Sequence, residues 1–517
     1  MNSSSGESHS QNISPSDFDL NGYQPMSVAH QIRGALLHNI KNKKALLPEI
    51  DGREESKADV IRTLLSGAHP YLVSEEGTGK TRLSRSLTNL LPGVPIIKGC
   101  PYNDDPKWSH DRLCPRCREK EDPVAAFGID FIPGVKRFSR IQGNEYTNEA
   151  KLLGVKDIQS IVQGRSLSDP QVFTGTGVFR ANRGILFVDE MPAIRTKIQV
   201  LFHPVLEEKM AVLEEYNWQH PLDLIFVATG NPMGFSHVND IPRPLLDRLE
   251  LVYMDMPDED VEKKIMLTEK FRETELETGR PDYDTPQYFT SDDIARKVVA
   301  PWWIIDIVNK AVRHSRICQY VEKRPSIRAS IKALDHTYAS TEIENKQVSN
   351  LSHAYYGIRL ALRGRVGLRA DLIDFDEPRK TFVLINKLSE DFLWNVFENI
   401  YKDPSFIGEW DRQKVGTELR AMLNSGIDFS EGKVADAVLA EYPEVNEIIQ
   451  RMRNLGKERT DPVTATKYDL KLYDSTDDDV IGELNYSAIE TLGNICVHSK
   501  TLSDSQLSQM FYANEYV

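Results

Sequence analysis

A short loop between an apolar triplet and a helical stretch carries the residues best suited to chemistry. Residues 74–81 read SEEGTGKT. Gly77 and Gly79 allow the backbone to approach a ligand closely, and unpaired N–H groups at the start of a helix favour a phosphate. Lys80 can reach the β- and γ-phosphates of a nucleotide, and the Thr81 hydroxyl can face Mg²⁺. The stretch therefore predicts a phosphate-binding loop.

The first position of this loop departs from the usual pattern. The motif G-x-x-x-x-G-K-[ST] has glycine where this chain has Ser74. Serine is small and can adopt unusual backbone angles at modest cost, so we interpret Ser74 as a tolerated substitution at a strand end. On this interpretation, Ser74→Gly leaves hydrolysis similar or improves it. The alternative is a chance Gly-Lys-Thr in a turn, and segments further along the chain decide against it.

Two later segments place polar side chains directly after apolar runs. Residues 184–190 read GILFVDE, so that Asp189 and Glu190 end a strand at the edge where open α/β sheets bind ligands. Asp189 would bind Mg²⁺, and Glu190 would polarise the attacking water. Residues 224–232 read LIFVATGNP, and Asn231 could orient that water.

A further segment, RPLLDRLE at residues 243–250, carries Arg243 and Arg248. An arginine presented to the γ-phosphate of a neighbouring subunit stabilises the charge of phosphoryl transfer. The sequence therefore contains all the residue types that nucleotide hydrolysis needs, in four separate segments.

Strands and helices must position these segments. Short apolar runs without polar alternation are typical of strands buried on both faces. They occur at Tyr71–Val73, Val94–Ile97, Ile185–Val188 and Leu224–Ala228. Helical spacing lies between them, over Leu83–Leu91 and Ile194–Val205. The alternation predicts an α/β fold with a mostly parallel sheet and helices on both faces. After about Pro257, amphipathic helices dominate, at Glu262–Glu277, Trp302–Tyr320 and Ile327–Thr341.

With these segments in this order, the chain resembles the AAA+ ATPases, and among them the magnesium-chelatase ATPase subunit and the MoxR group. The likeness runs through residues 46–256, in EGTGKT, FTGTGVFRANRGILFVDE, ATGNP and RPLLDR. Residues 209–221 fall where this clade has a β-hairpin. The resemblance implies an AAA+ P-loop αβα core with a parallel sheet, followed by an α-helical lid and a mostly helical C-terminal region.

The resemblance also implies roles for single residues. Nucleotide binding falls to Glu76, Gly77, Thr78, Gly79, Lys80, Thr81 and Asp189, with Thr81 and Asp189 at Mg²⁺. Catalysis falls to Glu190, to Asn231 as first sensor, to Arg248 as arginine finger, and to Arg328 of SIRASIKAL (326–334) as second sensor. Arg243 is the other finger candidate. The chain departs from the family at Ser74, at Met191-Pro192-Ala193 and at Leu249, and none of these removes a charge that the chemistry needs.

These patterns divide the chain into four parts. We expect a disordered tail over 1–25, a nucleotide-binding core over 26–256 with an insertion at 93–145, a helical lid over 257–375, and a helical C-terminal domain over 376–517.

The insertion contains three of the five cysteines of the chain. Cys100, Cys114 and Cys117, together with His110, offer the ligand set of a structural zinc site. The spacing is less regular than that of a ribbon with two Cys-x-x-Cys arms, so reduced cysteines in a loop remain the alternative. Zinc would stabilise an insertion that has little apolar content to fold on.

Composition limits the classes of partner and the cellular location that we expect for this protein. A net charge of −14 argues against a general nucleic-acid binder. No apolar run approaches the roughly 18–20 residues needed to span a bilayer. The N-terminus lacks the basic and apolar regions of a signal peptide, and the cysteines make no disulfide framework. We therefore expect a cytoplasmic protein.

The resemblance implies an ATP- and Mg²⁺-dependent remodelling ATPase that acts as a ring, expected to be a hexamer. Its partner would be a protein with a von Willebrand A domain, and its role complex maturation or metal insertion. Two alternatives stay open. One is a DNA-associated motor of the same clade, which Glu207, Glu208, Glu214 and Glu215 argue against. The other is a nucleotide-dependent scaffold with little hydrolysis, which Glu190 argues against.

Overall fold

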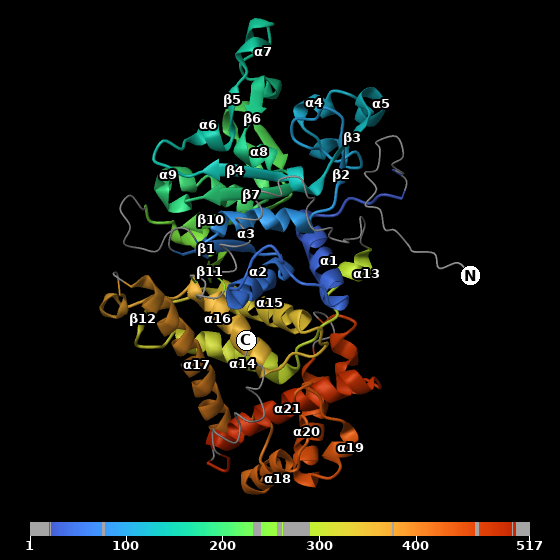
Figure 1. Ribbon diagram of the computed structural model, residues 1–517, viewed down its shortest axis with the longest axis vertical. Helices are drawn as coiled ribbons and strands as arrows, with labels where there is room; N and C mark the ends of the chain where they lie inside the picture. Colours follow the sequence, from blue (N-terminus) through green and yellow to red (C-terminus); the bar gives the residue numbers. More distant parts are fainter. Residues whose placement is uncertain are drawn as a thin grey trace, which may run out of the picture. The chain divides into compact units, whose positions relative to one another are not determined.

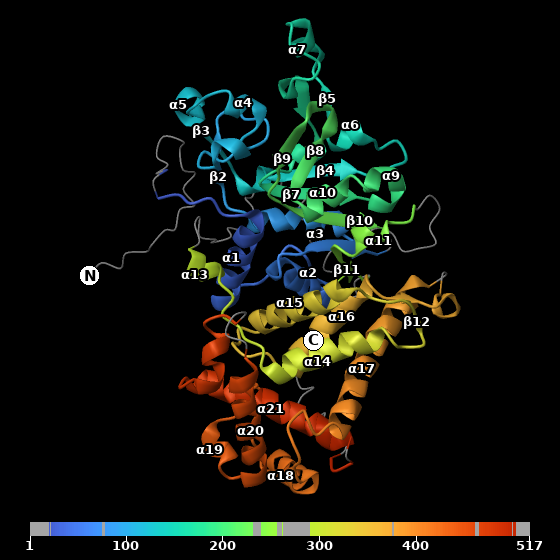
Figure 2. The same cartoon turned by 180° about the vertical axis from the view of Figure 1, so that it is seen from behind.

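The structure is a computed structural model that describes residues 20, 22–74, 78–230, 239–255, 261, 290–374, 377–460, 465–498 and 500–502. The chain forms two compact units (Figures 1 and 2). The α/β unit comprises the residues up to Arg53, His69–Arg248 and Met254–Ile294. The helical unit comprises Glu54–Ala68, Leu249–Tyr253 and the residues from Ala295 onward.

A five-stranded sheet with the order β11-β1-β10-β7-β4 organises the fold. β1 (His69–Val73) pairs in parallel with β10 (Leu224–Gly230), and β10 pairs in parallel with β7 (Gly184–Asp189). β4 (Phe138–Gln142) pairs in parallel with the other side of β7. Because these strands are parallel, their carboxyl ends meet at one edge. Among the described residues predicted to do chemistry, Lys80 follows β1, Asp189 ends β7 and Glu190 follows it, so these three lie at that edge.

Helices cover the sheet of the α/β unit. α1 (Val28–Lys41) and α3 (Lys80–Ser86) pack against β10, and α8 (Gly177–Arg180) packs against β4. The further short helices are α4 (Pro115–Arg118), α5 (Pro123–Phe127), α6 (Glu149–Leu152), α7 (Ile158–Val162), α9 (Thr196–Gln199), α10 (Phe202–Glu207), α11 (Arg243–Leu246) and α13 (Ser291–Ile294).

Three antiparallel strand pairs complete this unit. They are β2 (Val94–Ile97) with β3 (Ile129–Ile132), β5 (Gly154–Lys156) with β6 (Phe173–Gly175), and β8 (Met210–Leu213) with β9 (Trp218–Pro221). The β5–β6 pair leads away from the sheet to α7 (Figure 1). The β8–β9 pair confirms the hairpin expected within residues 209–221.

The predicted strands at 71–73, 185–188 and 224–228 are confirmed as parts of β1, β7 and β10. Two expectations are corrected. The strand at 94–97 exists, but it pairs with β3 and is not a strand of the main sheet. The range 93–145, predicted as an insertion, also contains β4, which is a strand of the main sheet.

Two smaller corrections concern a helix and the tail. The helix expected over 194–205 is two helices, α9 and α10. Pro204 lies in the first turn of α10, where its missing N–H removes no hydrogen bond. Tyr23, which falls within the tail expected over 1–25, is buried and hydrogen-bonded to Asp105 and Arg183.

The helical unit contains α2 (Glu54–Leu65), β11 (Leu249–Tyr253), α14 (Trp302–Ser315), β12 (Val321–Lys323), α15 (Ile327–Ile343), α16 (Leu351–Arg363), β13 (Gly367–Leu368), α17 (Pro378–Lys402), α18 (Arg412–Asn424), α19 (Asp436–Leu439), α20 (Pro443–Arg459) and α21 (Asp478–His498). The predicted helices at 302–320 and 327–341 correspond to α14 and α15. The helix expected at 262–277 lies outside the described residues.

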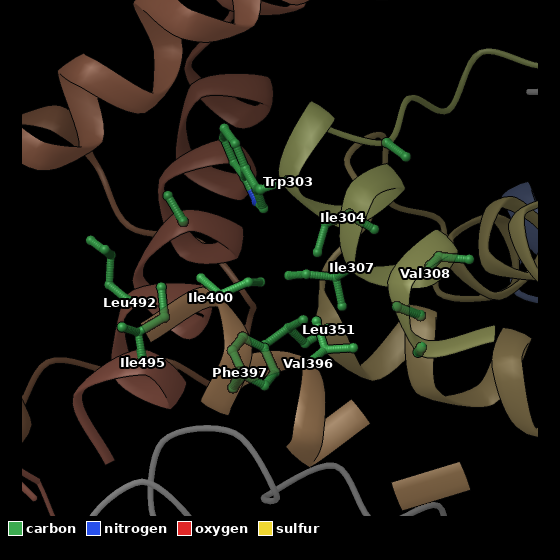
Figure 3. Packing of buried hydrophobic residues seen from close by; sticks show 14 of the residues in the cluster. Trp303, Ile304, Ile307, Val308, Leu351, Val396, Phe397, Ile400, Leu492 and Ile495 are labelled. Carbon is green, nitrogen blue, oxygen red and sulfur yellow. The ribbon is translucent and has the colours of Figure 1, made fainter. Parts of the chain in front are cut away.

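One continuous apolar core joins these helices. Trp303 and Ile307 of α14 point toward Phe397 of α17 and Leu492 of α21 (Figure 3). The core extends from Val299 to Leu502. The expected boundary between a lid ending at 375 and a separate domain beginning at 376 therefore falls inside one compact unit. None of the helices in the described ranges is long and apolar enough to cross a membrane.

Candidate nucleotide-binding site

The loop after β1 is held by its own serine and lysine. Ser74 is fully buried, and its hydroxyl is hydrogen-bonded to the Thr78 hydroxyl. Lys80 begins α3, and its Nζ donates to the Ser74 carbonyl at 2.7 Å and lies 3.5 Å from the Gly230 carbonyl. Gly79 has a φ of 86°, in the left-handed region that favours glycine. The lysine thus links the end of β1 to the end of β10.

Two carboxylates with different surroundings follow β7. Asp189 is buried; its Oδ1 accepts from the Thr229 hydroxyl at 2.7 Å, and its Oδ2 accepts from the Arg140 guanidinium at 2.5 Å. Glu190 is exposed, and its carboxylate accepts from the Gln142 amide at 3.3 Å. The Glu190 N–H donates to the Thr229 hydroxyl at 2.9 Å. Thr229 therefore orients both carboxylate residues from the neighbouring strand.

The sequence did not predict these supporting residues. Thr229 had a usable signal, because it is a polar residue at the end of an otherwise apolar buried strand, within the ATGNP segment. Arg140 and Gln142 had none, because β4 alternates buried and exposed positions and shows no continuous apolar run. Only the pairing of β4 with β7 brings them beside the carboxylates.

The remaining predicted residues of this site in the described part of the α/β unit are Thr81 and the two candidate arginine fingers. Thr81 is exposed on the first turn of α3. Arg243 is exposed at the start of α11, whereas Arg248 donates to the Glu207 carboxylate at 2.7 Å and to the Pro244 carbonyl. Both candidate fingers therefore belong to the α/β unit, where Arg248 is paired with the Glu207 carboxylate.

Four predicted residues are not among the described residues of the α/β unit. Glu76, Gly77 and Asn231 lie outside the described residues. Arg328 is the second residue of α15 in the helical unit, where its N–H donates to the Ser326 hydroxyl at 3.2 Å. The roles of these four residues stay predictions.

The described residues of the edge combine three chemical features. The start of α3 offers backbone N–H groups and the Lys80 ammonium, which suit phosphate groups. The Thr81 hydroxyl and the Asp189 carboxylate are hard oxygen donors, which suit Mg²⁺. The exposed Glu190 carboxylate is placed to accept a proton from water. The donor set therefore fits a magnesium–nucleotide complex.

The cysteine cluster forms a second site, and its fourth member differs from the prediction. The side chains of Cys100, Cys114, Cys117 and Asp104 are all buried, and their ligand atoms lie within 4.8 Å of one another. His110 is exposed, and its Nε2 lies 3.1 Å from the Lys120 carbonyl. Asp104 therefore takes the place expected for His110.

Burial and mutual contact shift the pKa values of this cluster. Burial raises the pKa of the Asp104 carboxyl to about 7, and the neighbouring Cys100 contributes. Burial also acts to raise the pKa of Cys100, but hydrogen bonds from Cys114, Cys117 and two backbone N–H groups outweigh it and lower that pKa to about 3. The pKa values of Cys114 and Cys117 are raised, mainly because they donate to Cys100. The cluster thus stabilises one thiolate.

Comparison with known proteins finds a family model that matches part of this core. Residues 135–249 match the family model described as AAA domain (dynein-related subfamily). That range includes β4, β7 and β10, with both carboxylates and Thr229. This part of the chain is similar to an AAA domain.

The curated relatives are magnesium-chelatase ATPase subunits, to which the chain is distantly homologous. The magnesium-chelatase 38 kDa subunit of Cereibacter sphaeroides is 28% identical over 245 residues, which cover 46% of this chain and 63% of that subunit. The magnesium-chelatase subunit ChlI of Guillardia theta is 26% identical over 368 residues, covering 68% of this chain and 94% of that subunit. The match to subunit ChlI of Nostoc spans 51% of that protein, so the chain spans about half to two thirds of several relatives.

Solved structures are similar at lower identity. A structure from Cytophaga hutchinsonii, described as that of a candidate ATPase, is 15% identical over 70% of this chain and 96% of its own, with a TM-score of 0.48. A complex between subunits BchI and BchD of magnesium chelatase contains a chain that is 18% identical, with a TM-score of 0.35, covering 63% of this chain and 96% of its own.

Proposed function

We propose that this protein hydrolyses ATP with Mg²⁺ as cofactor. The observation that carries the proposal is the connected set of contacts at the carboxyl edge of the sheet. Lys80 bonds the Ser74 carbonyl after β1 and approaches Gly230 of β10. Thr229 of β10 bonds Asp189 of β7. Three separate segments with the residue types needed for nucleotide hydrolysis thus converge on one place.

The roles of the individual residues follow from their surroundings. Lys80 and the N–H groups at the start of α3 bind phosphate oxygens. Asp189 and Thr81 would hold Mg²⁺, which would supply neutralising charge to the nucleotide phosphates. Glu190 accepts the proton of the attacking water, because its carboxylate is exposed and is oriented by Gln142. Thr229 fixes the distance between the metal-binding carboxylate and the base.

We further propose that the chain works as a ring, with a hexamer as the expected state, on a partner protein. An arginine finger acts on the nucleotide of a neighbouring subunit, so Arg248 or Arg243 would require oligomers. The solved complex of BchI with BchD supports a partner chain only as an analogy, and a von Willebrand A-domain partner stays the expectation from the resemblance. Asn231 as first sensor and Arg328 as second sensor belong to the same proposal.

Two matched variants test this proposal. Glu190→Gln keeps the hydrogen-bonding shape but loses the base, so it should bind ATP and hydrolyse it at least about 100-fold more slowly. Lys80→Ala should lose ATP binding itself. Hydrolysis is measured by phosphate release, binding by titration with a fluorescent ATP analogue, and oligomer mass by sedimentation with and without ATP.

Capture of partners on the ATP-bound Glu190→Gln variant, with Lys80→Ala as the control, tests the remodelling role. A protein enriched only on Glu190→Gln would support it. Wild-type hydrolysis no faster than that of Lys80→Ala would refute the ATPase proposal. Equal recovery of all proteins on both variants would remove the support for a remodelling role.

A further inference from the structure

The cluster of Cys100, Cys114, Cys117 and Asp104 has the dimensions of a tetrahedral metal site. The Cys100 and Cys114 sulfurs are 3.7 Å apart, which is too far for a disulfide. A zinc–sulfur bond of about 2.3 Å in tetrahedral geometry places two sulfurs about 3.8 Å apart. The two sulfurs therefore already lie at the separation that one bound Zn²⁺ would require.

The backbone around the cluster prepares the ligands for a metal. The N–H groups of Tyr102 and Asp104 donate to the Cys100 sulfur at 3.4 and 3.3 Å. The Cys114 N–H donates to Asp104 Oδ2 at 2.6 Å. These donors stabilise negative charge on a thiolate and on a carboxylate, which are the forms that bind metals. None of these N–H groups donates to the other carboxylate oxygen, Asp104 Oδ1.

Two buried polar groups beside the cluster have no hydrogen-bond partner in the structure. Asp104 Oδ1 is one, and both ring nitrogens of His220 in β9 are the other. His220 is fully buried, and its Nε2 lies 3.8 Å from Asp104 Oδ1. Buried polar atoms without partners are costly and call for an unseen ligand or ion. A cation bound by Asp104 would satisfy the carboxylate.

We propose that Cys100, Cys114, Cys117 and Asp104 bind one structural Zn²⁺, with His220 as a positioning residue behind the Asp104 carboxylate. Three thiolates select a soft or borderline metal over Mg²⁺ or Ca²⁺. Four protein ligands leave no open position for a substrate, so the site is structural. This inference does not rest on the proposed ATPase activity.

The metal would tie the loop after β2 to the start of α4. Cys100 follows β2, and Cys114 and Cys117 flank the start of α4. The same loop contacts the residues before β7: Asn103 donates to the Asn182 carbonyl at 3.1 Å, and Asn182 donates to the Tyr102 carbonyl at 2.7 Å. Zinc would therefore also stabilise the segment that leads into the strand ending at Asp189.

The choice between Asp104 and His110 makes the site testable. Metal content is measured by plasma mass spectrometry on the full chain, expressed with zinc and purified under reducing conditions. The wild type should carry one zinc per chain. His110→Ala and Cys318→Ser, both outside the cluster, should keep it. Asp104→Ala and Cys117→Ser should lose it or bind at least about 10-fold more weakly in competition with a chromophoric chelator.

Cobalt and a His220 variant provide independent readouts. Co²⁺ added to the metal-free wild type should give the intense visible bands of tetrahedral thiolate coordination, and Cys117→Ser should weaken them. His220→Phe keeps the aromatic packing, so it should fold but bind zinc about 10- to 100-fold more weakly, as expected for a group that supports a ligand. His220→Gln, which restores a donor, should recover part of that affinity.

Several outcomes would overturn the proposal. The first is a wild-type chain that carries no zinc and shows five reactive thiols on unfolding. The second is a chain that shows fewer than five reactive thiols because a disulfide has formed. The third is a His110→Ala variant that loses zinc together with an Asp104→Ala variant that keeps it. If the variants fail to fold, the cobalt spectrum of the wild type still tests the site. A spectrum without thiolate bands would also refute the proposal. Failure of ATP hydrolysis with zinc present would leave this inference intact.

Discussion

Ser74 provides the sharpest test of the phosphate loop, because the sequence and the structure lead to opposite expectations. The motif predicts that Ser74→Gly leaves hydrolysis similar or improves it. In the structure the Ser74 hydroxyl is buried and hydrogen-bonded to the Thr78 hydroxyl, across the loop from one end to the other. Glycine would remove that bond and make the chain more flexible at the same point. We therefore predict that Ser74→Gly weakens nucleotide binding.

The magnitude follows from two contributions. A hydrogen bond of this kind stabilises by about 0.5–1.5 kcal/mol. Glycine in an ordered position costs roughly 0.5–1 kcal/mol more than a residue with a side chain. If the whole cost of about 1–2.5 kcal/mol falls on the binding step, the dissociation constant for ATP rises about 5- to 60-fold.

A double-mutant cycle isolates the hydrogen bond. ATP affinity is measured for Ser74→Ala, Thr78→Val and the double variant by fluorescence titration. The coupling energy between the two positions should be about 0.5–1.5 kcal/mol. Ser86→Ala, which removes a serine hydroxyl that bonds the Leu83 carbonyl in the following helix, is the matched control and should leave affinity unchanged.

Two results would refute this reasoning. One is strict additivity of the Ser74 and Thr78 effects, which would show that the hydroxyls do not interact in the working protein. The other is a Ser74→Gly variant that binds and hydrolyses ATP as well as the wild type or better. In that case the motif alone would describe the loop correctly, and the buried contact would have no role in nucleotide binding.

Four other variants test the site and the fold. Thr229→Val removes the hydroxyl that bonds Asp189, so the magnesium concentration for half-maximal hydrolysis should rise while thermal stability changes little; an unchanged magnesium dependence would contradict the role. Arg243→Ala and Arg248→Ala should separate the two candidates for the arginine finger. The variant that lacks the true finger should lose hydrolysis in a phosphate-release assay while it keeps its affinity for ATP. Glu490→Gln should change how stability depends on pH, since burial raises the pKa of the Glu490 carboxyl from its ordinary 4.5 to about 8. A raised carboxyl pKa means that the folded state keeps the proton longer, so wild-type stability should fall between pH 4.5 and 8 by at most about 1.4 kcal/mol per unit. The free energy of unfolding, measured in urea at pH 5, 6.5 and 8, should lack this decline in the variant. Parallel pH dependences of wild type and variant would refute the role of Glu490.

Local pattern was enough to predict much of the fold. The runs that became β1, β7 and β10 are apolar throughout because both faces of these strands are covered, so they stand out in the sequence without tertiary information. The same signal misled at residues 94–97, where an equally buried run pairs outside the main sheet. An apolar run indicates burial, but it does not name the partner strand.

The sheet-edge strand β4 shows the opposite limit. Its residues alternate between buried and exposed, as expected for a strand with one covered face. In the sequence this strand lies within a region expected to be an insertion. Arg140 and Gln142, which contact the two carboxylates, were missed for that reason. Their role depends on which strand pairs with β7, and pairing is a long-range property.

The sequence by itself determined which stretches carry the phosphate-loop, carboxylate and arginine motifs, because each of those motifs is a local stretch with its own spacing. Only the tertiary structure decided which side chains meet. It put Asp104 in place of His110 beside three cysteines, brought His220 from β9 to that carboxylate, and joined Ser74 to Thr78. The physical reason is that ligand sets and hydrogen bonds need atoms within a few ångströms. Residue spacing along a folded loop does not specify such distances.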